Sequence, residues 1–491
     1  MLSLVRILML GGIVGKVIGV LRELVFAWLY GTGAVSAAYR MAQAAFLMPL
    51  HGFVSETVNS AFTPAFANHR GSNPERAQAL FSGLHAILLC ISVVVAVLIM
   101  VFAPWWIKLL APGFDPRTAE LSILMLRVMA VAMPAYVLSG LYAATRMAQG
   151  YGAMSAWRAT AQSIGLLAGS IIAWVLDVPV LIAVGFLGAY IVMLVWGTLS
   201  IRRSGLTLFP AIGEWRACLD PLHGVWRIFK ILVWVPIVLL LYSIIERRVA
   251  SVVSPDAVAA LDYSRFVTDT MVILIASPFA MAGLSAMVTM GVEDYRRTAI
   301  KSMRIMLLIG MPMSALFFVH AEAIIRILFA RGAFDEDSVQ VTSAIFGPMS
   351  LGIWGTLVGY AGARFLSARG QNSQVLKITV IGVIGGLLVN LFGVQLFGVS
   401  VLGVAALVNG MIIGGLGIWA TGVWAGVRKD CLLFGAASGI YIFLWFQSGL
   451  NDHAGLLMTT VVATVFWSLV LLFPRNRELV SNIIVLLRKK I

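Results

Sequence analysis

Charged residues are scarce in this sequence, and acidic residues are the scarcest. Only 11% of its 491 residues are Asp, Glu, Lys or Arg, whereas a soluble protein averages about 25%. Because 60% of the residues are hydrophobic, this scarcity argues against an ordinary soluble domain. The charge that remains is basic, with 35 Lys and Arg against 21 Asp and Glu. It is spread over short segments between apolar runs, which argues against nucleic-acid binding.

Cysteines and catalytic motifs are scarce as well. Cys90, Cys218 and Cys431 are far apart in the sequence, so they indicate neither a disulfide framework nor a metal site. The histidines do not cluster, and the sequence has no phosphate-cradling loop and no Ser/His/Asp arrangement. We therefore expect no cofactor, no metal and no catalytic residue. Any work that the chain does must depend on the membrane potential, a cation gradient or the supply of substrate.

Long apolar runs are what the sequence has in abundance. A hydrocarbon core about 30 Å thick needs about 20 apolar residues per helical span, and only helices or closed barrels satisfy their backbone in lipid. The alternating pattern of a membrane barrel is missing. The prediction is an all-α polytopic membrane protein, with the first run as an uncleaved span. About fourteen helices are expected, centred near residues 18, 48, 94, 134, 166, 191, 240, 273, 310, 353, 385, 412, 441 and 464.

The positions of Lys and Arg predict the orientation of these helices. Most of the 35 basic residues fall at the two termini or in connections that follow even-numbered helices. Connections that follow odd-numbered helices hold only Lys108, Arg117, Arg326 and Arg331. By the positive-inside rule, both termini are cytoplasmic.

A repeat divides the sequence into two similar halves. LLAPGFD at Leu109–Asp115 resembles FARGAFD at Phe329–Asp335, and the glycines that follow, Gly150 and Gly370, have the same offset from each other as the two motifs. An even repeat of six helices gives both halves the same orientation in the membrane. We expect a first lobe at 1–205, a second lobe at 206–428, and two further helices with a cytoplasmic tail at 429–491.

Several cations lie inside the expected spans. At the centre of a lipid-facing helix each would cost about 2.5 to 3.5 kcal/mol, so they must face protein or water. Acidic residues near them are fewer, which leaves the interior net positive. The seven cations are Lys16, Arg22, Arg40, Arg127, Arg247, Arg248 and Arg265.

Helical spacing predicts how two of these cations are held. Asp262, Arg265 and Asp269 are spaced i, i+3 and i+7, so they share one helix face on which the acids support Arg265. On the first helix, Arg22 shares a stripe with three glycines, which predicts close packing and an inward guanidinium on the same side. The three glycines are Gly12, Gly15 and Gly19.

The charged helices, the first, second, seventh and eighth, occupy matching positions in the two halves and predict a cationic cavity between them. Arginine forks suit phosphate oxygens, so a pyrophosphate is a suitable guest. The expected binding residues are Lys16, Arg22, Arg40, Arg248 and Arg265, with Glu23, Asp262 and Asp269 in support. The alternative is that these charges form structural ion pairs, which is our interpretation of Arg127.

Five stretches resemble the MurJ/MviN family of lipid-linked oligosaccharide flippases, within the superfamily of multidrug, oligosaccharidyl-lipid and polysaccharide exporters. The stretches are GKVIGVLRELVFAWLYGTG (15–33), SAFTPAFA (60–67), APWWIKLLAPGF (103–114), YSRF (263–266) and LFARGAFDEDS (328–338). The resemblance implies fourteen helices in two lobes around a central cationic cavity, with a groove for a lipid tail. It also implies that Arg22 and Arg265 are functional arginines, and that Lys16 replaces an arginine.

Two positions depart from the family pattern. Ala37 stands where the family typically has an acid, and Leu50 stands where it typically has another cavity arginine. Arg40 or the pair Arg247 and Arg248 could supply the missing cation. The departure leaves two substrates open, peptidoglycan lipid II and an exopolysaccharide repeat unit, both carried on undecaprenyl pyrophosphate.

The resemblance and the charge pattern together predict a flippase, not an enzyme, in the bacterial inner membrane. It would move the lipid-linked glycan by alternating access, within the lipid bilayer and beside the machinery of cell-envelope glycan synthesis. Two alternatives stay open. A multidrug or cation antiporter of the same superfamily would favour buried carboxylates, and a membrane glycosyltransferase or ligase would need larger outer loops.

Overall fold

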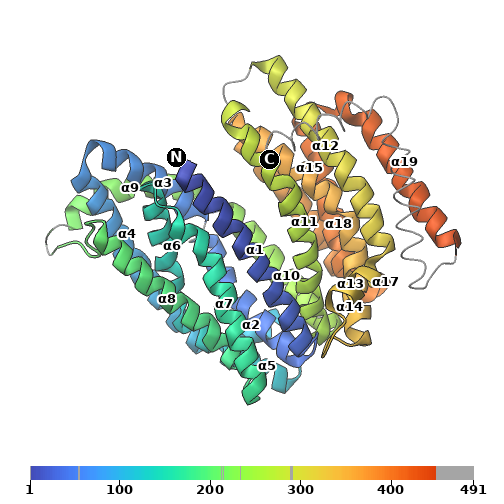
Figure 1. The fold of residues 1–491 in the computed structure, drawn as a ribbon, viewed down its shortest axis with the longest axis horizontal. Helices are drawn as coiled ribbons and strands as arrows, with labels where there is room; N and C mark the ends of the chain where they lie inside the picture. The colour runs from blue at the N-terminus through green and yellow to red at the C-terminus, as the bar shows by residue number, and fades with distance from the viewer. Residues whose placement is uncertain are drawn as a thin grey trace. The chain divides into compact units, whose positions relative to one another are not determined.

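The computed structural model describes residues 2–53, 56–211, 213, 215–232, 234–287 and 291–448. Helices make up almost all of this described chain, and it contains no strand (Figure 1). The predicted all-α class is therefore confirmed. The helix expected near residue 464 lies outside the described residues.

The first part of the chain forms ten helices among the residues described. They are α1 (Leu2–Tyr30), α2 (Ala34–Phe53), α3 (Glu56–Ser72), α4 (Pro74–Leu110), α5 (Pro116–Val131), α6 (Met133–Ala148), α7 (Ala153–Leu176), α8 (Leu181–Arg203), α9 (Trp215–Leu232) and α10 (Trp234–Val253). The rest of the described chain follows the same pattern. Its helices are α11 (Pro255–Met287), α12 (Val292–Val319), α13 (Ala321–Phe329), α14 (Glu336–Leu351), α15 (Ile353–Ala368), α16 (Asn372–Phe392), α17 (Val394–Phe397), the 3-10 turn η1 (Gly398–Ser400), α18 (Val401–Ala420) and α19 (Trp424–Ser448).

Seven of the described helices are long and apolar enough to cross a membrane. Two further spans are bent pairs, α5 with α6 at 46° and α14 with α15 at 48°, which raises the number to nine. The sequence predicted one helix at each of these two places, without the bend. It also missed α3 and α9, which are helical although they lie between the expected spans.

The internal repeat extends beyond the two loops in which the sequence reveals it. The helices α5 and α14 begin at corresponding positions of the repeat and have the same length, and so do α6 and α15. Gly150 and Gly370 end these bent pairs with φ of 87° and 71°, a conformation that glycine adopts without steric cost. Each half therefore builds the same broken span and stops it in the same way.

The described chain divides into two compact units. Unit 1 contains the chain to Ala259 together with Phe329–Ser338, and unit 2 contains Ala260–Leu328 and the chain from Val339. The helix α10, which the sequence assigns to the second lobe, contacts α2, α4 and α9 of unit 1. The three-part division expected from the repeat stays a prediction, because packing and repeat divide the chain at different points.

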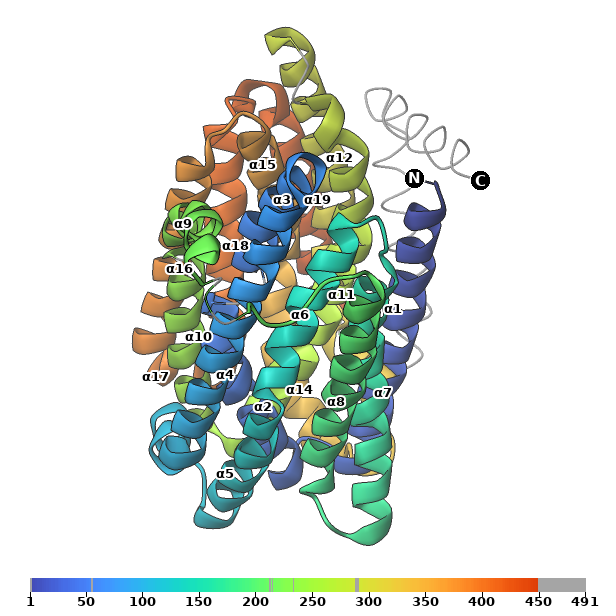
Figure 2. The same ribbon diagram turned by 90° about the vertical axis from the view of Figure 1, so that its left-hand side faces the viewer.

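In unit 1, α1, α7 and α8 lie side by side (Figures 1 and 2). Small residues allow the close approach of α1 and α7: a Cβ at Gly11 would lie 2.6 Å from Ala156 Cβ, and one at Gly15 would lie 2.7 Å from Thr160 Oγ1. Gly12 has nothing within 4 Å, so the expected stripe is wrong at that position. The packing face of α1 is set by Gly11 and Gly15.

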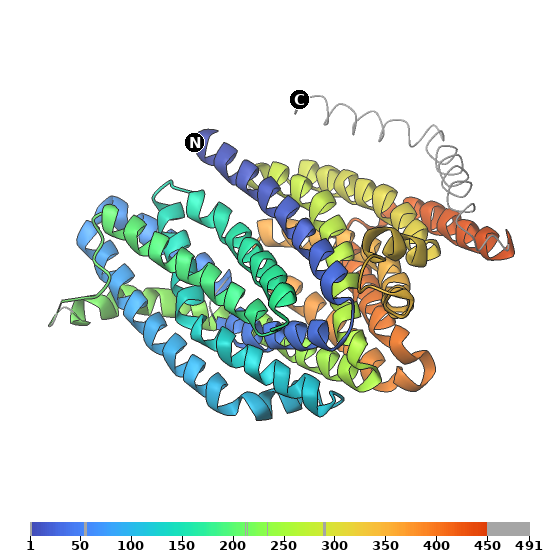
Figure 3. The same ribbon diagram turned by 60° about the horizontal axis from the view of Figure 1, so that its bottom comes forward.

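In unit 2, the helix α19 packs beside α12 (Figure 3), and two polar contacts join these segments. Arg304 Nε lies 3.0 Å from the buried Asp430 Oδ2, and His320 Nε2 lies 3.2 Å from Tyr441 Oη. Between these contacts, buried apolar residues of α12, α15 and α19 form a core. The thirteenth expected helix is thus an integral part of this unit.

Two similar loops dock on helix ends within unit 1. The loop before α14 donates a hydrogen bond from Ala333 N to Trp28 O at 2.8 Å, and a Cβ at Gly31 would lie 2.2 Å from Ala333 O. The loop before α5 reaches Ser251, whose carbonyl oxygen would lie 2.0 Å from a Cβ at Gly113. Gly31 and Ser251 occupy corresponding positions of the two halves, and so do Gly113 and Ala333. Each loop therefore covers the end of the first helix of the other half.

Candidate anion-binding site

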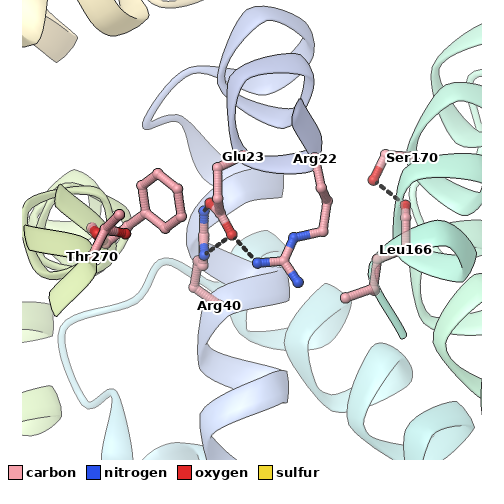
Figure 4. Close-up of polar contacts among 7 residues, drawn as sticks. Arg22, Glu23, Arg40, Leu166, Ser170 and Thr270 are labelled. Carbon is pink, nitrogen blue, oxygen red and sulfur yellow. Dashed lines mark hydrogen bonds and ion pairs between the residues drawn. The ribbon is translucent and has the colours of Figure 1, made fainter. Parts of the chain in front are cut away.

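Glu23 lies between two arginines in the interior of unit 1 (Figure 4). Arg22 and Arg40 each donate a short hydrogen bond to its carboxylate, and Arg40 Nη1 lies 3.4 Å from Oε1. Glu23 and Arg40 are buried, whereas the side chain of Arg22 is 20% exposed. Two guanidinium groups share one carboxylate, so the cluster carries a net positive charge.

The hairpin of α1 and α2 brings these three residues together. Arg22 and Glu23 are neighbours near the end of α1, and Arg40 lies in the second turn of α2. Aromatic rings of the same hairpin support the Arg40 guanidinium, whose Cζ lies 5.2 Å from the Phe26 ring centre and 5.9 Å from that of Tyr39. Arg40 is therefore fixed in place, and Arg22 is the more accessible of the two cations.

Lys16 and Arg248 do not join this cluster. Lys16 is exposed on α1, two turns before Glu23. Arg248 is exposed on α10, where its Nη1 donates to Leu109 O at 3.1 Å, one of the last carbonyls of α4. Cations stabilise the carbonyl end of a helix, which gives Arg248 a structural role in this conformation. Their assignment as binding residues stays a prediction.

Arg265, Asp262 and Asp269 belong to α11 in unit 2. Arg265 and Asp262 are half-buried and Asp269 is exposed, while Tyr263, Ser264 and Val267 are buried. The helix thus places the three charged residues on one face, as their spacing predicts. Because Arg22 and Arg265 belong to different compact units, their joint action on one ligand stays a prediction.

Two of the remaining cations of the spans, Arg247 and Arg127, have backbone partners. Arg247 is buried, with Nη1 3.5 Å from Val258 O, and its neighbour Glu246 is fully buried. Arg127 is exposed and donates from Nε to Met100 O at 3.2 Å. Its interpretation as a member of a structural ion pair stays a prediction. Whether Arg247 and Arg248 replace the missing cavity arginine stays a prediction.

Arg158 is a half-buried cation whose place in a helix the sequence did not predict. It was assigned to a connection, but it lies in α7, where it donates to Ser139 Oγ at 3.3 Å and to Tyr136 O at 3.1 Å. Its Cζ lies 4.5 Å from the Tyr136 ring centre. The sequence signal that could have placed Arg158 in a helix is Gly150, because α7 begins only a few residues after it, at Ala153.

Among the described residues there is no candidate metal site, and a groove elsewhere in unit 1 is apolar. None of the described His, Cys, Asp and Glu residues form a group of three or more that could hold a metal ion. An apolar groove of about 440 Å³ lies between α7 and α8, lined by small and aliphatic residues such as Gly165, Gly169 and Gly185. It contains no charged residue, so it does not suit an anionic group.

Comparison with known proteins identifies the family. The family described as "Lipid II flippase MurJ" matches residues 26–475. A protein of Synechocystis sp. named "Probable lipid II flippase MurJ" is 25% identical over 420 residues, which are 79% of this chain and 76% of that protein.

Solved structures show the same fold. A lipid II flippase MurJ in an inward closed conformation has a TM-score of 0.80 at 17% identity, covering 96% of this chain and 99% of its own. An inward-facing multidrug transporter of the MATE family and the MOP superfamily has a TM-score of 0.69 at 14% identity, covering 86% and 98%. The fold is therefore that of a multi-pass membrane transporter, and the family match over most of its length shows that this chain belongs to the lipid II flippase MurJ family.

Proposed function

We propose that this chain moves lipid II, or a closely related glycan on undecaprenyl pyrophosphate, from the inner to the outer leaflet of the bacterial inner membrane. The family match over residues 26–475 carries this proposal, because its members are named as lipid II flippases. The net positive cluster of Arg22, Glu23 and Arg40 supplies the complementary charge for a pyrophosphate. The predicted orientation, with both termini cytoplasmic, agrees with a substrate made on the cytoplasmic side.

The mechanism that fits this proposal is alternating access. The pyrophosphate would bind Arg22 and Arg265, with Lys16, Arg40 or Arg248 as further partners, while the polyprenyl tail stays in lipid. Glu23 would hold Arg40 in place. Arg22 would keep N–H donors for a ligand, because Arg22 donates only one hydrogen bond to the Glu23 carboxylate. Outward movement of an anion is favoured by about 2.3 kcal/mol per charge per 100 mV of inside-negative potential. A cation gradient is the other candidate source of energy.

A second candidate substrate is an exopolysaccharide repeat unit. Ala37 and Leu50, the two departures from the family pattern, are both buried in α2. Arg40, one turn after Ala37, is the buried cation that this helix does supply. The handle for the pyrophosphate is thus retained, while the contacts to the sugars would differ.

The two other classes that the sequence left open are less suitable. Membership of a transporter family excludes the glycosyltransferase or ligase alternative. A multidrug antiporter shares the fold, but the cluster at Glu23 pairs one carboxylate with two guanidinium groups. A cationic drug would be repelled by such a cluster.

Complementation of a bacterium depleted of its own lipid II flippase tests the proposal. We expect the wild-type chain to restore growth and the exposure of lipid II on the outer leaflet, and Arg22→Glu or Arg265→Glu to abolish both at equal protein level in the membrane. Arg127→Gln is the matched control, because Arg127 is an arginine of a span that contacts only a backbone carbonyl among the described residues. Full complementation by both charge-reversed variants would overturn the assignment.

A further inference from the structure

Arg158 has the environment of a ligand-binding residue. Its Nε and Nη2 donate hydrogen bonds to residues of α6, and none of the described carboxylates pairs with it. The side chain is half-buried and lies across Gly140, where a Cβ would be 3.7 Å from Nη2. A cation of a membrane span that lacks a counter-charge faces the protein interior or water, and often marks a substrate pathway.

The direction of the Arg158 side chain excludes simple snorkelling. Arg158 is five residues from the start of α7, about 8 Å along the helix. Its partners Ser139 and Tyr136 are nine and twelve residues before the end of α6, about 14 and 18 Å from that end. Since a short turn joins the two helices, the guanidinium reaches toward the membrane interior. A snorkelling arginine would turn toward the interface instead.

Packing of α1 on α7 relates Arg158 to the cluster at Arg22. Gly11 lies at the level of Ala156 and Gly15 at the level of Thr160, so the two helices run parallel. Arg158 is therefore about nine residues, or about 13 Å, nearer to the N-terminal ends of these helices than Arg22. In the predicted orientation these ends are cytoplasmic.

A cluster of buried aromatic rings continues from Arg158 toward the interior of unit 1. The Arg158 Cζ lies 5.8 Å from the Tyr190 ring centre, and Tyr190 and Tyr136 are 4.8 Å apart. Phe46 of α2 contacts Tyr136 edge-on at 5.7 Å. These rings hold the guanidinium in a fixed orientation, so it is better suited than a mobile surface arginine to donate hydrogen bonds repeatedly to an anion.

We propose that Arg158 is an additional binding residue for the anionic head of the substrate, on the cytoplasmic approach to Arg22, Glu23 and Arg40. This inference rests on the proposed function, and it names a contact that the family motifs quoted above do not include. The free edge of its guanidinium would donate to a phosphate oxygen before the head reaches Arg22. The ligand class is a phosphate or pyrophosphate ester, and the sugars play no part in the contact.

Binding to the purified, detergent-solubilised protein tests this role directly. Native mass spectrometry would titrate the wild type, Arg158→Gln, Arg158→Lys and Arg22→Gln with undecaprenyl pyrophosphate, and with undecaprenol as the ligand that lacks phosphates. We expect Arg158→Gln to weaken the binding of the pyrophosphate about tenfold or more, because a hydrogen bond to a charged group is lost. Arg158→Lys should retain part of the affinity, since it keeps the charge but loses the fork. Undecaprenol binding should not change.

The controls separate this inference from the proposed function. Arg127→Gln should bind the pyrophosphate like the wild type, and the melting temperature of each variant reports on its folding. If Arg22→Gln weakens binding and Arg158→Gln does not, the role of Arg158 is wrong while the proposed function stands. If Arg158→Gln weakens the binding of undecaprenol as much as that of the pyrophosphate, the role of Arg158 is structural. Failure of the wild type to bind the pyrophosphate would overturn both.

Discussion

At the scale of single residues, Glu23 determines how the cations of unit 1 behave. One carboxylate accepts hydrogen bonds from both Arg22 and Arg40, and the rings of Phe26 and Tyr39 lie beside Arg40. Removing one partner of a buried ion pair destabilises a protein strongly, because the other charge stays desolvated without a counter-charge. Glu23 is therefore best understood as the residue that keeps Arg40 buried and Arg22 available.

Gly31 is a residue at which a single methyl group should disrupt the docked loop. Its φ is 54°, which costs an alanine about 1 to 2 kcal/mol, and the new Cβ would lie 2.2 Å from Ala333 O. We expect Gly31→Ala to destabilise the protein by about 2 kcal/mol or more, measured as a lower melting temperature in detergent. Gly33→Ala is the control, because its Cβ would meet nothing closer than Tyr30 O at 3.8 Å. Equal melting temperatures for the two variants would contradict the docking of this loop.

The sequence predicted individual charged residues better than their partners. Helical spacing places Asp262, Arg265 and Asp269 on one face, as the structure has them, because that relation is local to one helix. The contact between Glu23 and Arg40 depends on how α1 turns into α2, which spacing does not encode. Arg158 was missed because its position near the start of α7 resembles a connection, and its contacts are formed with another helix.

At the scale of elements, the two halves begin corresponding helices with the same cap. Asp115 accepts hydrogen bonds from Arg117 N and Thr118 N at the start of α5, and Asp335 accepts one from Ser338 N at the start of α14. The side chain of Thr118, with the backbone N–H groups of Thr118 and Arg117, lowers the pKa of Asp115 below its ordinary value of 3.8. The backbone N–H and the side chain of Ser338 lower the pKa of Asp335 in the same way. The start of each broken span is thus fixed by a residue outside the apolar run.

Removal of the Asp335 cap should have a pH-dependent cost. A carboxyl group whose pKa is lowered by folding stabilises the folded state above its unfolded pKa, and this contribution is lost as the pH falls through the folded value. We expect Asp335→Ala to cost about 1 kcal/mol near pH 7, and its difference from the wild type to disappear as the pH falls below 3.8. Melting temperatures between pH 3 and 7 measure this. Asp335→Asn caps the helix without a titrating group, so its melting temperature should not depend on pH in this way. A difference between Asp335→Ala and the wild type that stays constant from pH 3 to 7 would argue against the cap.

Composition predicts the long spans well and the interruptions poorly. Apolar runs fix α4, α7, α8 and α12, because lipid requires them. The breaks at Ala132 and Gly352 fall at corresponding positions of the repeat, although Pro134 lies beside the first and Pro348 precedes the second. Proline position therefore does not define the break. The helix α9 was missed because its basic residues resemble those of a connection, yet it packs on α4 and α3.

At the scale of the whole molecule, the segment Phe329–Ser338 connects chain regions that pack separately. It is flanked by residues of unit 2, but its contacts place it in unit 1. Thr32 Oγ1 lies 2.9 Å from Ser338 Oγ, which adds a side-chain contact to the backbone hydrogen bond at Trp28. The repeat in the sequence predicted that the two loops correspond, but not that each would dock on the other half.

A disulfide across this contact tests whether it opens during transport. In a cysteine-free background, Thr32→Cys combined with Ser338→Cys should lose its maleimide-reactive thiols on oxidation, because the two hydroxyl groups are 2.9 Å apart. If alternating access separates these helix ends, oxidation should also stop lipid translocation in liposomes, and a reducing agent should restore it. The single variants should respond to neither treatment. Translocation by the oxidised double variant would show that this contact stays closed throughout.

The same docked loop has a consequence for the synthesis of the protein. Gly31 leaves the ribosome about 300 residues before Ala333, which at 5 to 20 residues per second is a delay of about 15 to 60 s. During that interval the end of α1 is inserted without the segment that covers it. Unit 1 can therefore be completed only after the first part of unit 2, Ala260–Leu328, has been made. Chains truncated before residue 329 should be recognised by membrane quality-control proteases even though nearly all of unit 1 is present.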